Sequence, residues 1–205
     1  MIRILAVDDH AIVRDGIARL VATQPDMELV AEASDGREAV EQFRKHRPDI
    51  TLMDLQMPNM CGIDAINAIR SELPEARIVV LTTYAGDVQV QRALRAGAQG
   101  YLLKGSLRKE LLETIRAVHG GHKRLTAEIA AEIAEHAMDT GLTPREISVL
   151  KLIAGGNANK EIAAQLHLTE ESVKGYVKNI LFKLGANDRT HAVTIGLKRG
   201  IIDLQ

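Results

Sequence analysis

The 205-residue sequence contains one cysteine, no tryptophan and only 2% aromatic residues. A lone Cys61 excludes an intramolecular disulfide and a zinc site built from cysteines, and it fits a reducing cytosol. No apolar run approaches the roughly 18 residues of a membrane-spanning helix, and the N-terminal MIRILAV is too short for a signal-peptide core. We therefore expect a cytoplasmic protein that does not associate with a membrane and has an aliphatic core.

Neither sign of charge is in large excess, because the formal net charge is −1. Apolar residues make up 46% of the chain and charged residues 26%, as in ordinary globular proteins. The charge is unevenly spread: residues 141–205 hold 9 Lys and Arg against 6 Asp and Glu, whereas residues 1–120 hold 15 against 17. A mildly basic C-terminal part is compatible with nucleic-acid binding, although many solvated surfaces have the same balance.

Residues 1–120 alternate between short apolar runs and segments with helical spacing. The pattern of a strand followed by a helix occurs five times, which predicts an α/β fold with a five-stranded parallel sheet covered by helices on both faces. The predicted strands are 2–7, 27–33, 49–54, 76–82 and 100–104.

The rest of the chain reads as helical. We interpret residues 121–140 as a linker that contains a helix, and residues 141–205 as an all-α domain of four helices. Thr143, followed by Pro144 and Glu146, predicts the start of the first of these helices. Short helices joined by turns of three or four residues are typical of a helix-turn-helix domain.

Polar side chains follow four of the predicted strands. Asp8 and Asp9 follow the first strand, Asp54 ends the third, Thr82 the fourth and Lys104 the fifth. Because the carboxyl ends of parallel strands meet at one edge of a sheet, we expect these side chains to converge. Three adjacent carboxylates favour a hard divalent cation such as Mg²⁺ among them. Such a site would bind a phosphoryl group, which a carboxylate attacks.

Each of these residues also has an ordinary interpretation when it is taken alone. Asp9 would cap the first helix, and Lys104 would be a solvated surface lysine. His10, directly after the acidic pair, fits a surface or capping role better than a ligand role. Only the shared position at the strand ends favours a common site.

Four motifs, VDDH, PDITLMDLQMPNMCGID, LTT and GYLLK, resemble the receiver domain of bacterial two-component response regulators across residues 1–120. The resemblance implies a flavodoxin-like fold in which Asp54 accepts a phosphoryl group from a sensor histidine kinase. It also implies that Lys104 pairs with the phosphoryl oxygens, and that Thr82 and Tyr101 move when Asp54 is phosphorylated.

The same resemblance assigns Mg²⁺ to Asp8, Asp9, Asp54 and the backbone carbonyl of Gln56, with Asp8 acting mainly through a metal-bound water. Gln56 and Tyr84 flank the site and would influence hydrolysis of the phosphoaspartate. One departure is that Gly105 follows Lys104, where many receivers have proline. We therefore expect a turn there that uses the conformational freedom of glycine.

The segment NKEIAAQLHLTEESVKGYVKNILFKL, within residues 142–193, resembles the LuxR-type helix-turn-helix. Together with a receiver it indicates a NarL/FixJ-type regulator, whose third C-terminal helix enters the major groove of promoter DNA. The fourth helix is the expected dimer surface, although its apolar residues would equally serve the core. The apolar stripe of the third helix is predicted to be Val173, Val177, Ile180 and Leu184.

The outer side of this third helix is the predicted DNA-contacting surface. Gly175 lies there between two lysines, where glycine costs roughly 1 kcal/mol relative to alanine. Phe182 lies off the buried stripe and has no clear role in the pattern. The predicted DNA-binding residues are Lys160, Thr169, Ser172, Lys174, Gly175 and Lys178.

The leading hypothesis is a DNA-binding transcriptional regulator that phosphorylation at Asp54 switches, with homodimerisation on activation. The receiver would catalyse only its own phosphorylation and dephosphorylation. A second hypothesis is a phosphatase with an aspartyl-phosphate intermediate, although such enzymes usually place an Asp-x-Asp motif on one strand and no substrate cap is evident here. A third is a constitutive dimer that regulates without phosphate.

Overall fold

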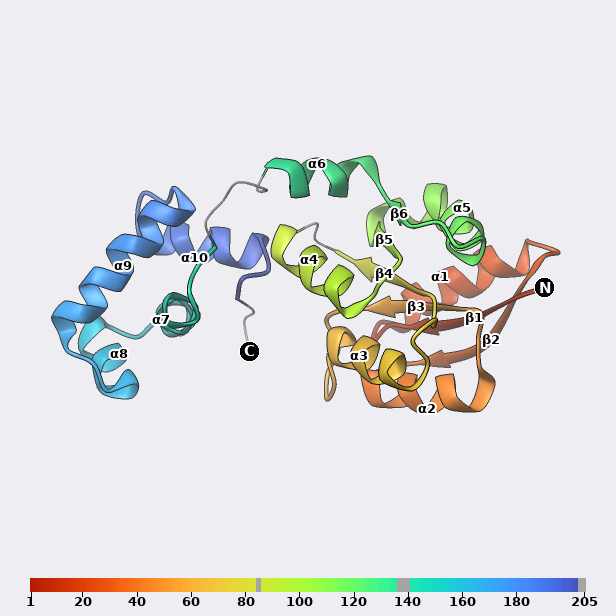
Figure 1. Cartoon of the computed structure of the whole chain (residues 1–205), viewed down its shortest axis with the longest axis horizontal. Coiled ribbons are helices and arrows are strands. Elements are labelled where there is room, and N and C mark those ends of the chain that lie inside the picture. Colours follow the sequence, from red (N-terminus) through yellow and green to blue (C-terminus); the bar gives the residue numbers. More distant parts are fainter. Residues whose placement is uncertain (84–85, 136–140, 203–205) are drawn as a thin grey trace. The chain divides into compact units, whose positions relative to one another are not determined.

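The structure is a computed structural model that describes residues 1–83, 86–135 and 141–202 (Figure 1). The chain forms two compact units, one built around a sheet and the other from helices. Among the described residues, no helix combines the length and the apolar character needed to cross a bilayer. The exact domain boundaries, at 120 and 140, stay a prediction.

The sheet of the first unit is wholly parallel, with strand order β2-β1-β3-β4-β5-β6. The five predicted strands are present, so the predicted fold class is confirmed. A sixth strand, β6, pairs with β5 inside the segment that was expected to hold only linker and helix. The strands are β1 Ile2–Val7, β2 Met27–Ala33, β3 Ile50–Asp54, β4 Ile78–Thr82, β5 Gly100–Leu103 and β6 Arg124–Leu125.

Helices cover both faces of this sheet (Figure 1). Helices α1 (Ala11–Ala22) and α5 (Leu107–His119) pack on one face, where Ile17 and Ile115 join alternate strand residues in a fully buried cluster. Helices α2 (Gly36–His46) and α3 (Gly62–Glu72) pack together on the other face. The remaining helices of this part of the chain are α4 (Asp87–Ala96) and α6 (Ala127–Glu135).

Residues 141–202, as far as the structure describes the C-terminal part of the chain, form the four predicted helices. They enclose one aliphatic cluster, which confirms Val173 and Ile180 as buried residues, while Val177 and Leu184 pack at its margin. The helices are α7 Pro144–Ala154, α8 Asn159–Leu166, α9 Glu170–Leu184 and α10 Arg189–Lys198.

The start of α7 has the predicted capping box. The Thr143 hydroxyl accepts a hydrogen bond from the Glu146 backbone N–H at 3.3 Å, and the Glu146 carboxylate accepts one from the Thr143 N–H at 2.7 Å. The same carboxylate lies 2.8 Å from Lys183 Nζ at the far end of α9. Glu146 therefore ties the first turn of α7 to the last turn of α9.

Candidate functional site

The acidic residues gather at the carboxyl ends of β1 and β3, where the order of the strands along the chain reverses. Val7 is paired with Met53, so Asp8 and Asp54, the next residues of the two chain segments, lie side by side. The Asp8 side chain is 0% exposed and that of Asp54 is 4% exposed. In open parallel sheets this crevice is where ligands bind.

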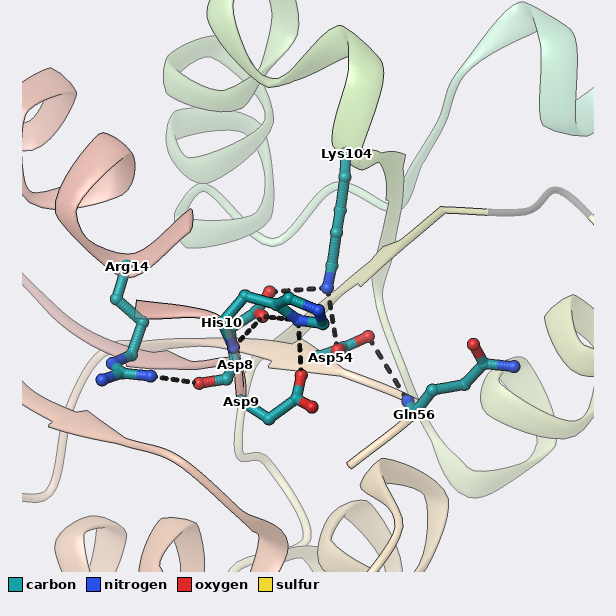
Figure 2. Close-up of polar contacts among 7 residues, drawn as sticks. All are labelled: Asp8, Asp9, His10, Arg14, Asp54, Gln56 and Lys104. Atoms are coloured by element: carbon teal, nitrogen blue, oxygen red, sulfur yellow. Dashed lines mark hydrogen bonds and ion pairs between the residues drawn. The ribbon is translucent and has the colours of Figure 1, made fainter. Parts of the chain in front are cut away.

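Lys104 lies between these two carboxylates (Figure 2). Its Nζ donates a hydrogen bond to Asp54 Oδ2 at 2.8 Å and forms an ion pair with Asp8 Oδ2 at 2.7 Å. Lys104 opens a 3₁₀ turn, Lys104–Ser106, that follows β5 directly. Gly105 is not among the residues with a positive φ, so the expectation that this turn needs glycine's conformational freedom was wrong. The right-handed 3₁₀ backbone is open to any residue type, and it presents the lysine by itself.

Burial and charge act in opposite directions on this pair. Burial raises the pKa of Asp54, because the ionised carboxylate is poorly solvated, and the ammonium of Lys104 offsets only part of that rise. For Lys104, burial lowers the pKa, but the bonds and charges of Asp54 and Asp8 outweigh it, so its pKa is raised. The lysine is therefore a persistent cation beside the carboxylates of Asp8 and Asp54.

Asp9 and His10 form the more open side of the cluster. Asp9 is 31% exposed and does not cap α1, whose N-cap position is His10 with no side-chain cap bond. The His10 ring instead places Nδ1 2.7 Å from Asp9 Oδ1 and 3.3 Å from Asp8 Oδ1. Its backbone N–H donates to Asp8 Oδ1 at 2.9 Å. Sequence reasoning missed these ring contacts, which no spacing rule signals.

The donor atoms suit a hard divalent cation. One ligand atom from each of Asp8, Asp9, His10 and Asp54 can be chosen so that all lie within 4.8 Å of one another. Three of the four are carboxylate oxygens, the ligands that Mg²⁺ prefers. The Gln56 N–H donates to Asp54 Oδ1 at 3.3 Å, and its side chain points away from the cluster (Figure 2). The assignment of these carboxylates and the Gln56 carbonyl as Mg²⁺ ligands stays a prediction.

Two residues outside the predicted set hold the backbone of the site. Arg14 Nη1 donates to the carbonyl oxygen of Asp8 at 2.6 Å, and its Nε donates to Glu32 at 3.1 Å. Gly62 lies so close to the end of β3 that a Cβ there would be 2.0 Å from the carbonyl oxygen of Asp54. The glycine after Cys61 is a visible signal in the sequence, whereas nothing in the sequence singles out Arg14.

Thr82 and Tyr101 are both enclosed. Thr82 ends β4 with 2% exposure, and Tyr101 is fully buried on the neighbouring strand β5. Burial raises the pKa of the Tyr101 phenol, with the charge of Asp54 adding to the rise and the Thr82 hydroxyl opposing it. The Tyr101 hydroxyl has no hydrogen bond of good geometry among the described residues. Tyr84, predicted to flank the site, lies outside the described residues.

The turn between α8 and α9 has a defined geometry. Helix α8 ends at Leu166 and is followed by the C-cap residue His167, whose φ of 53° is left-handed. Thr169 caps α9 by accepting a hydrogen bond from the Ser172 N–H at 3.1 Å. The Thr169 and Ser172 hydroxyls lie 2.8 Å apart. Both predicted DNA-contacting hydroxyls therefore lie exposed at the start of α9.

The outer side of α9 presents the other predicted residues to solvent. Lys174, Gly175 and Lys178 are exposed, as is Lys160 near the start of α8. Lys174 Nζ lies 3.6 Å from Glu171 and 4.0 Å from Glu170, and such surface ion pairs contribute little to stability. An added Cβ at Gly175 would meet no atom within 4 Å.

Both units of the chain, the one with the sheet and the one made of helices, match known protein families. Residues 4–116 match the response regulator receiver domain family, and residues 140–195 match the luxR family of bacterial regulatory proteins. The chain is 40% identical to the transcriptional regulatory protein LiaR of Bacillus subtilis over 211 residues, which covers 99% of this chain and 100% of LiaR.

Two solved structures extend the likeness across both units. The response regulator ChrA of a heme-sensing two-component system is 32% identical with a TM-score of 0.59, covering 98% of each chain. The response regulator RcsB in a complex with DNA is 25% identical with a TM-score of 0.72, covering 96% of this chain and 98% of RcsB. The chain therefore belongs to the bacterial two-component response regulators that carry a LuxR-type helix-turn-helix domain and regulate transcription.

Proposed function

We propose that Asp54 accepts a phosphoryl group from a sensor histidine kinase, and that this controls homodimerisation and promoter binding by α8 and α9. The main support is the Asp54 carboxylate itself, enclosed at the β1–β3 crevice with Lys104 at 2.8 Å and Asp8 beside it. A buried carboxylate next to a buried lysine and a second carboxylate is suited to phosphoryl transfer. Promoter DNA as the partner implies a cytoplasmic location.

In the proposed reaction, a carboxylate oxygen of Asp54 attacks the phosphorus of a phosphohistidine on the kinase. The O–P bond forms as the N–P bond breaks, and the imidazole of the kinase leaves. Lys104 exchanges its bond to Asp54 Oδ2 for a phosphoryl oxygen, because the ammonium is already at this position. Mg²⁺ bound to Asp8, Asp9, Asp54 and the Gln56 carbonyl would supply the remaining positive charge. The receiver thus acts only on its own aspartate.

The signal then passes through buried residues next to the site. Thr82 would turn its hydroxyl toward the phosphoryl group, and Tyr101 would fill the space behind it. This shift between two states would reshape the surface formed by α4, β5 and α5. Dimerisation through α10 would let two helix-turn-helix units bind two half-sites.

The proposal is tested by DNA binding with and without phosphorylation. The full chain is incubated with acetyl phosphate and Mg²⁺, with acetyl phosphate and EDTA, or alone, and its affinity for promoter duplexes selected from a random pool is measured. We expect one phosphoryl group per chain, on Asp54, and binding at least about tenfold tighter, which corresponds to about 1.4 kcal/mol. EDTA and the substitution Asp54→Asn should each abolish the gain.

Asp15→Asn is the matched control, because Asp15 is an exposed carboxylate of α1 outside the site. It should behave like the wild type in all three conditions. Continued release of phosphate from a phosphate monoester, in excess over protein, would support a phosphatase instead. Equal DNA affinity for wild type and Asp54→Asn in every condition would show a regulator that works without phosphate.

A further inference from the structure

Phe182 is one of two phenylalanines in the chain, and its side chain is exposed to solvent. It is 88% exposed, whereas Phe43 in the receiver core is 1% exposed. Its own helix has a buried side, marked by Val173 and Ile180, which Phe182 does not join. Single exposed apolar side chains are common on soluble proteins, so exposure alone implies no function. The position of Phe182 on α9 carries the inference.

Phe182 lies in one row with the predicted DNA-contacting residues. Successive helix residues are rotated by about 100°, so Gly175, Lys178 and Phe182, spaced at i, i+3 and i+7, share one side of α9. All three are exposed. With a rise of about 1.5 Å per residue, Phe182 lies about 6 Å along the helix axis beyond Lys178. A ligand that lies along the lysines therefore reaches the ring.

The described residues of the second unit leave this row exposed. An added Cβ at Gly175 would meet no atom within 4 Å, and Lys178 forms no ion pair among the described residues. Lys183, the neighbour of Phe182 in sequence, is directed to Glu146 on α7, at 2.8 Å. The row thus joins a residue without a side chain, a cation that is not engaged in an ion pair, and an aromatic ring.

The chemistry of a phenyl ring limits which groups of DNA it can contact. The ring has no hydrogen-bonding group, so it cannot read the donors and acceptors of base edges. The apolar group that base edges display in the major groove is the C5-methyl of thymine, which phenylalanine is able to contact. Lys178 would bring the phosphate backbone or a base edge to this side, and Gly175 would let the helix axis approach closely.

We propose that Phe182 is a further specificity-determining residue, whose ring packs on the methyl group of a thymine near the C-terminal end of α9. The inference rests on the proposed function, because it requires α9 to lie in the major groove. It assigns Phe182 a base-reading role in addition to the role of the lysines, and it predicts a preferred thymine at one position in each half-site.

The test removes the methyl group and the ring separately. Duplexes are selected from a random pool with the full chain treated with acetyl phosphate, and each thymine of the enriched half-site is then replaced by deoxyuridine, which lacks only the methyl. We expect the wild type to lose about fourfold in affinity at one position, because burying one methyl-sized group has this value. Phe182→Ala should bind the thymine duplex less tightly and be insensitive to deoxyuridine at that position.

Two further variants make the test specific. Phe182→Leu keeps an apolar side chain and should retain part of the sensitivity. Ile12→Ala removes an equally exposed apolar side chain from α1, where Ile12 is 80% exposed, and should leave DNA binding unchanged. Circular dichroism should show that all variants are folded, as expected for an exposed position.

The inference is overturned if Phe182→Ala keeps the wild-type affinity and sensitivity to deoxyuridine. It is also overturned if the variant binds DNA normally but loses self-association or transcriptional activation, because the ring then contacts a protein. If the wild type enriches no sequence and Lys178→Ala has no effect, the proposed function fails and this inference fails with it. A loss of binding with Lys178→Ala but not with Phe182→Ala overturns only the inference.

Discussion

Gly175 sits in the interior of α9, where the structure leaves open space around it. Replacing it by alanine removes backbone freedom from the unfolded chain and adds a methyl that clashes with nothing. We expect Gly175→Ala to raise the free energy of unfolding of the C-terminal unit by up to about 1 kcal/mol and to change promoter affinity or selectivity. Thermal unfolding and duplex binding measure the two effects.

Gly16 offers the matched control for this substitution. It is also an exposed glycine inside a helix, α1, and an added Cβ there would also meet nothing within 4 Å. Gly16→Ala should stabilise the receiver by a similar amount and leave promoter selectivity unchanged. If Gly175→Ala leaves affinity and selectivity unchanged as well, then Gly175 is only a tolerated helix defect and takes no part in groove contact.

Some contacts of the acidic site could be predicted from the sequence, and others could not. The convergence of Asp8, Asp54 and Lys104 follows from topology, because parallel strands end at one edge of the sheet. The contacts of His10 and Arg14 depend on how single side chains turn, and they leave no periodic pattern. Asp9 satisfied the sequence rule for a helix cap, yet its carboxylate lies beside the His10 ring instead.

At the scale of elements, Glu146 joins two helices of the DNA-binding unit. Its carboxylate accepts the Thr143 N–H and pairs with Lys183, while only 4% exposed. Removing it leaves a backbone donor and a half-buried ammonium without their partner. We expect Glu146→Ala to lower the free energy of unfolding of this unit by about 2 kcal/mol, the range of a hydrogen bond to a charged group. Scanning calorimetry of the full chain measures this.

Glu161 is the matched control, since it holds the same position in α8. It accepts the Ala158 N–H at 2.6 Å, but Ala158 offers no side-chain acceptor in return, and Glu161 is exposed. Glu161→Ala should therefore cost less than about 1 kcal/mol. Equal losses for the two variants would show that the Glu146–Lys183 pair adds nothing to the cap.

The stabilisation by Glu146 should also depend on pH. Burial raises the pKa of Glu146, but the Lys183 and Thr143 contacts outweigh it, so the pKa in the folded state is below the ordinary 4.5. A lowered folded pKa means that the contribution is complete above about pH 4.5 and is lost as pH falls through the folded pKa. The stability difference between wild type and Glu146→Gln should therefore narrow only in acid.

Helices and strands whose own residues follow a regular apolar pattern could be predicted from the sequence. A strand that is defined only by hydrogen bonds to a neighbouring strand could not. The strands β1, β3, β4 and β5 are mostly buried apolar runs, and β2 is partly buried. The sequence located each of the five within about two residues, the usual uncertainty of element ends. Strand β6 is only Arg124–Leu125, and it exists because Gly100 and Tyr101 lie beside it. Two residues hold no period, so only the distant partner strand identifies it. The α7 cap was predicted because all its participants are adjacent in sequence.

At the scale of the whole molecule, the net charge of −1 gives no overall attraction to DNA, so the proposed binding depends on local cations, whose number the proposed dimer would double. If each chain of a dimer contributes Lys160, Lys174 and Lys178, about six phosphates are neutralised. The slope of log affinity against log salt should then be about −5. Titration of a selected duplex at several salt concentrations measures this slope.

The effect of Lys178→Ala on this salt slope shows how many chains bind one DNA duplex. It should reduce the slope by about two for a dimer and by about one for a monomer, because each chain loses one phosphate contact. Lys45→Ala, an exposed lysine on α2 of the receiver, should leave the slope unchanged. A slope near zero for the wild type would contradict electrostatic groove binding altogether.

Gly62 and the carbonyl of Asp54 have a consequence for how this regulator diversifies. Any side chain at position 62 would clash with the backbone of β3, because its Cβ would lie 2.0 Å from the carbonyl oxygen of Asp54. Position 175 has free space around it and faces the expected ligand. A substitution at position 175 is therefore sterically open and, under the proposed function, would change which promoters are bound, whereas the backbone that positions Asp54 leaves no room for a side chain at position 62.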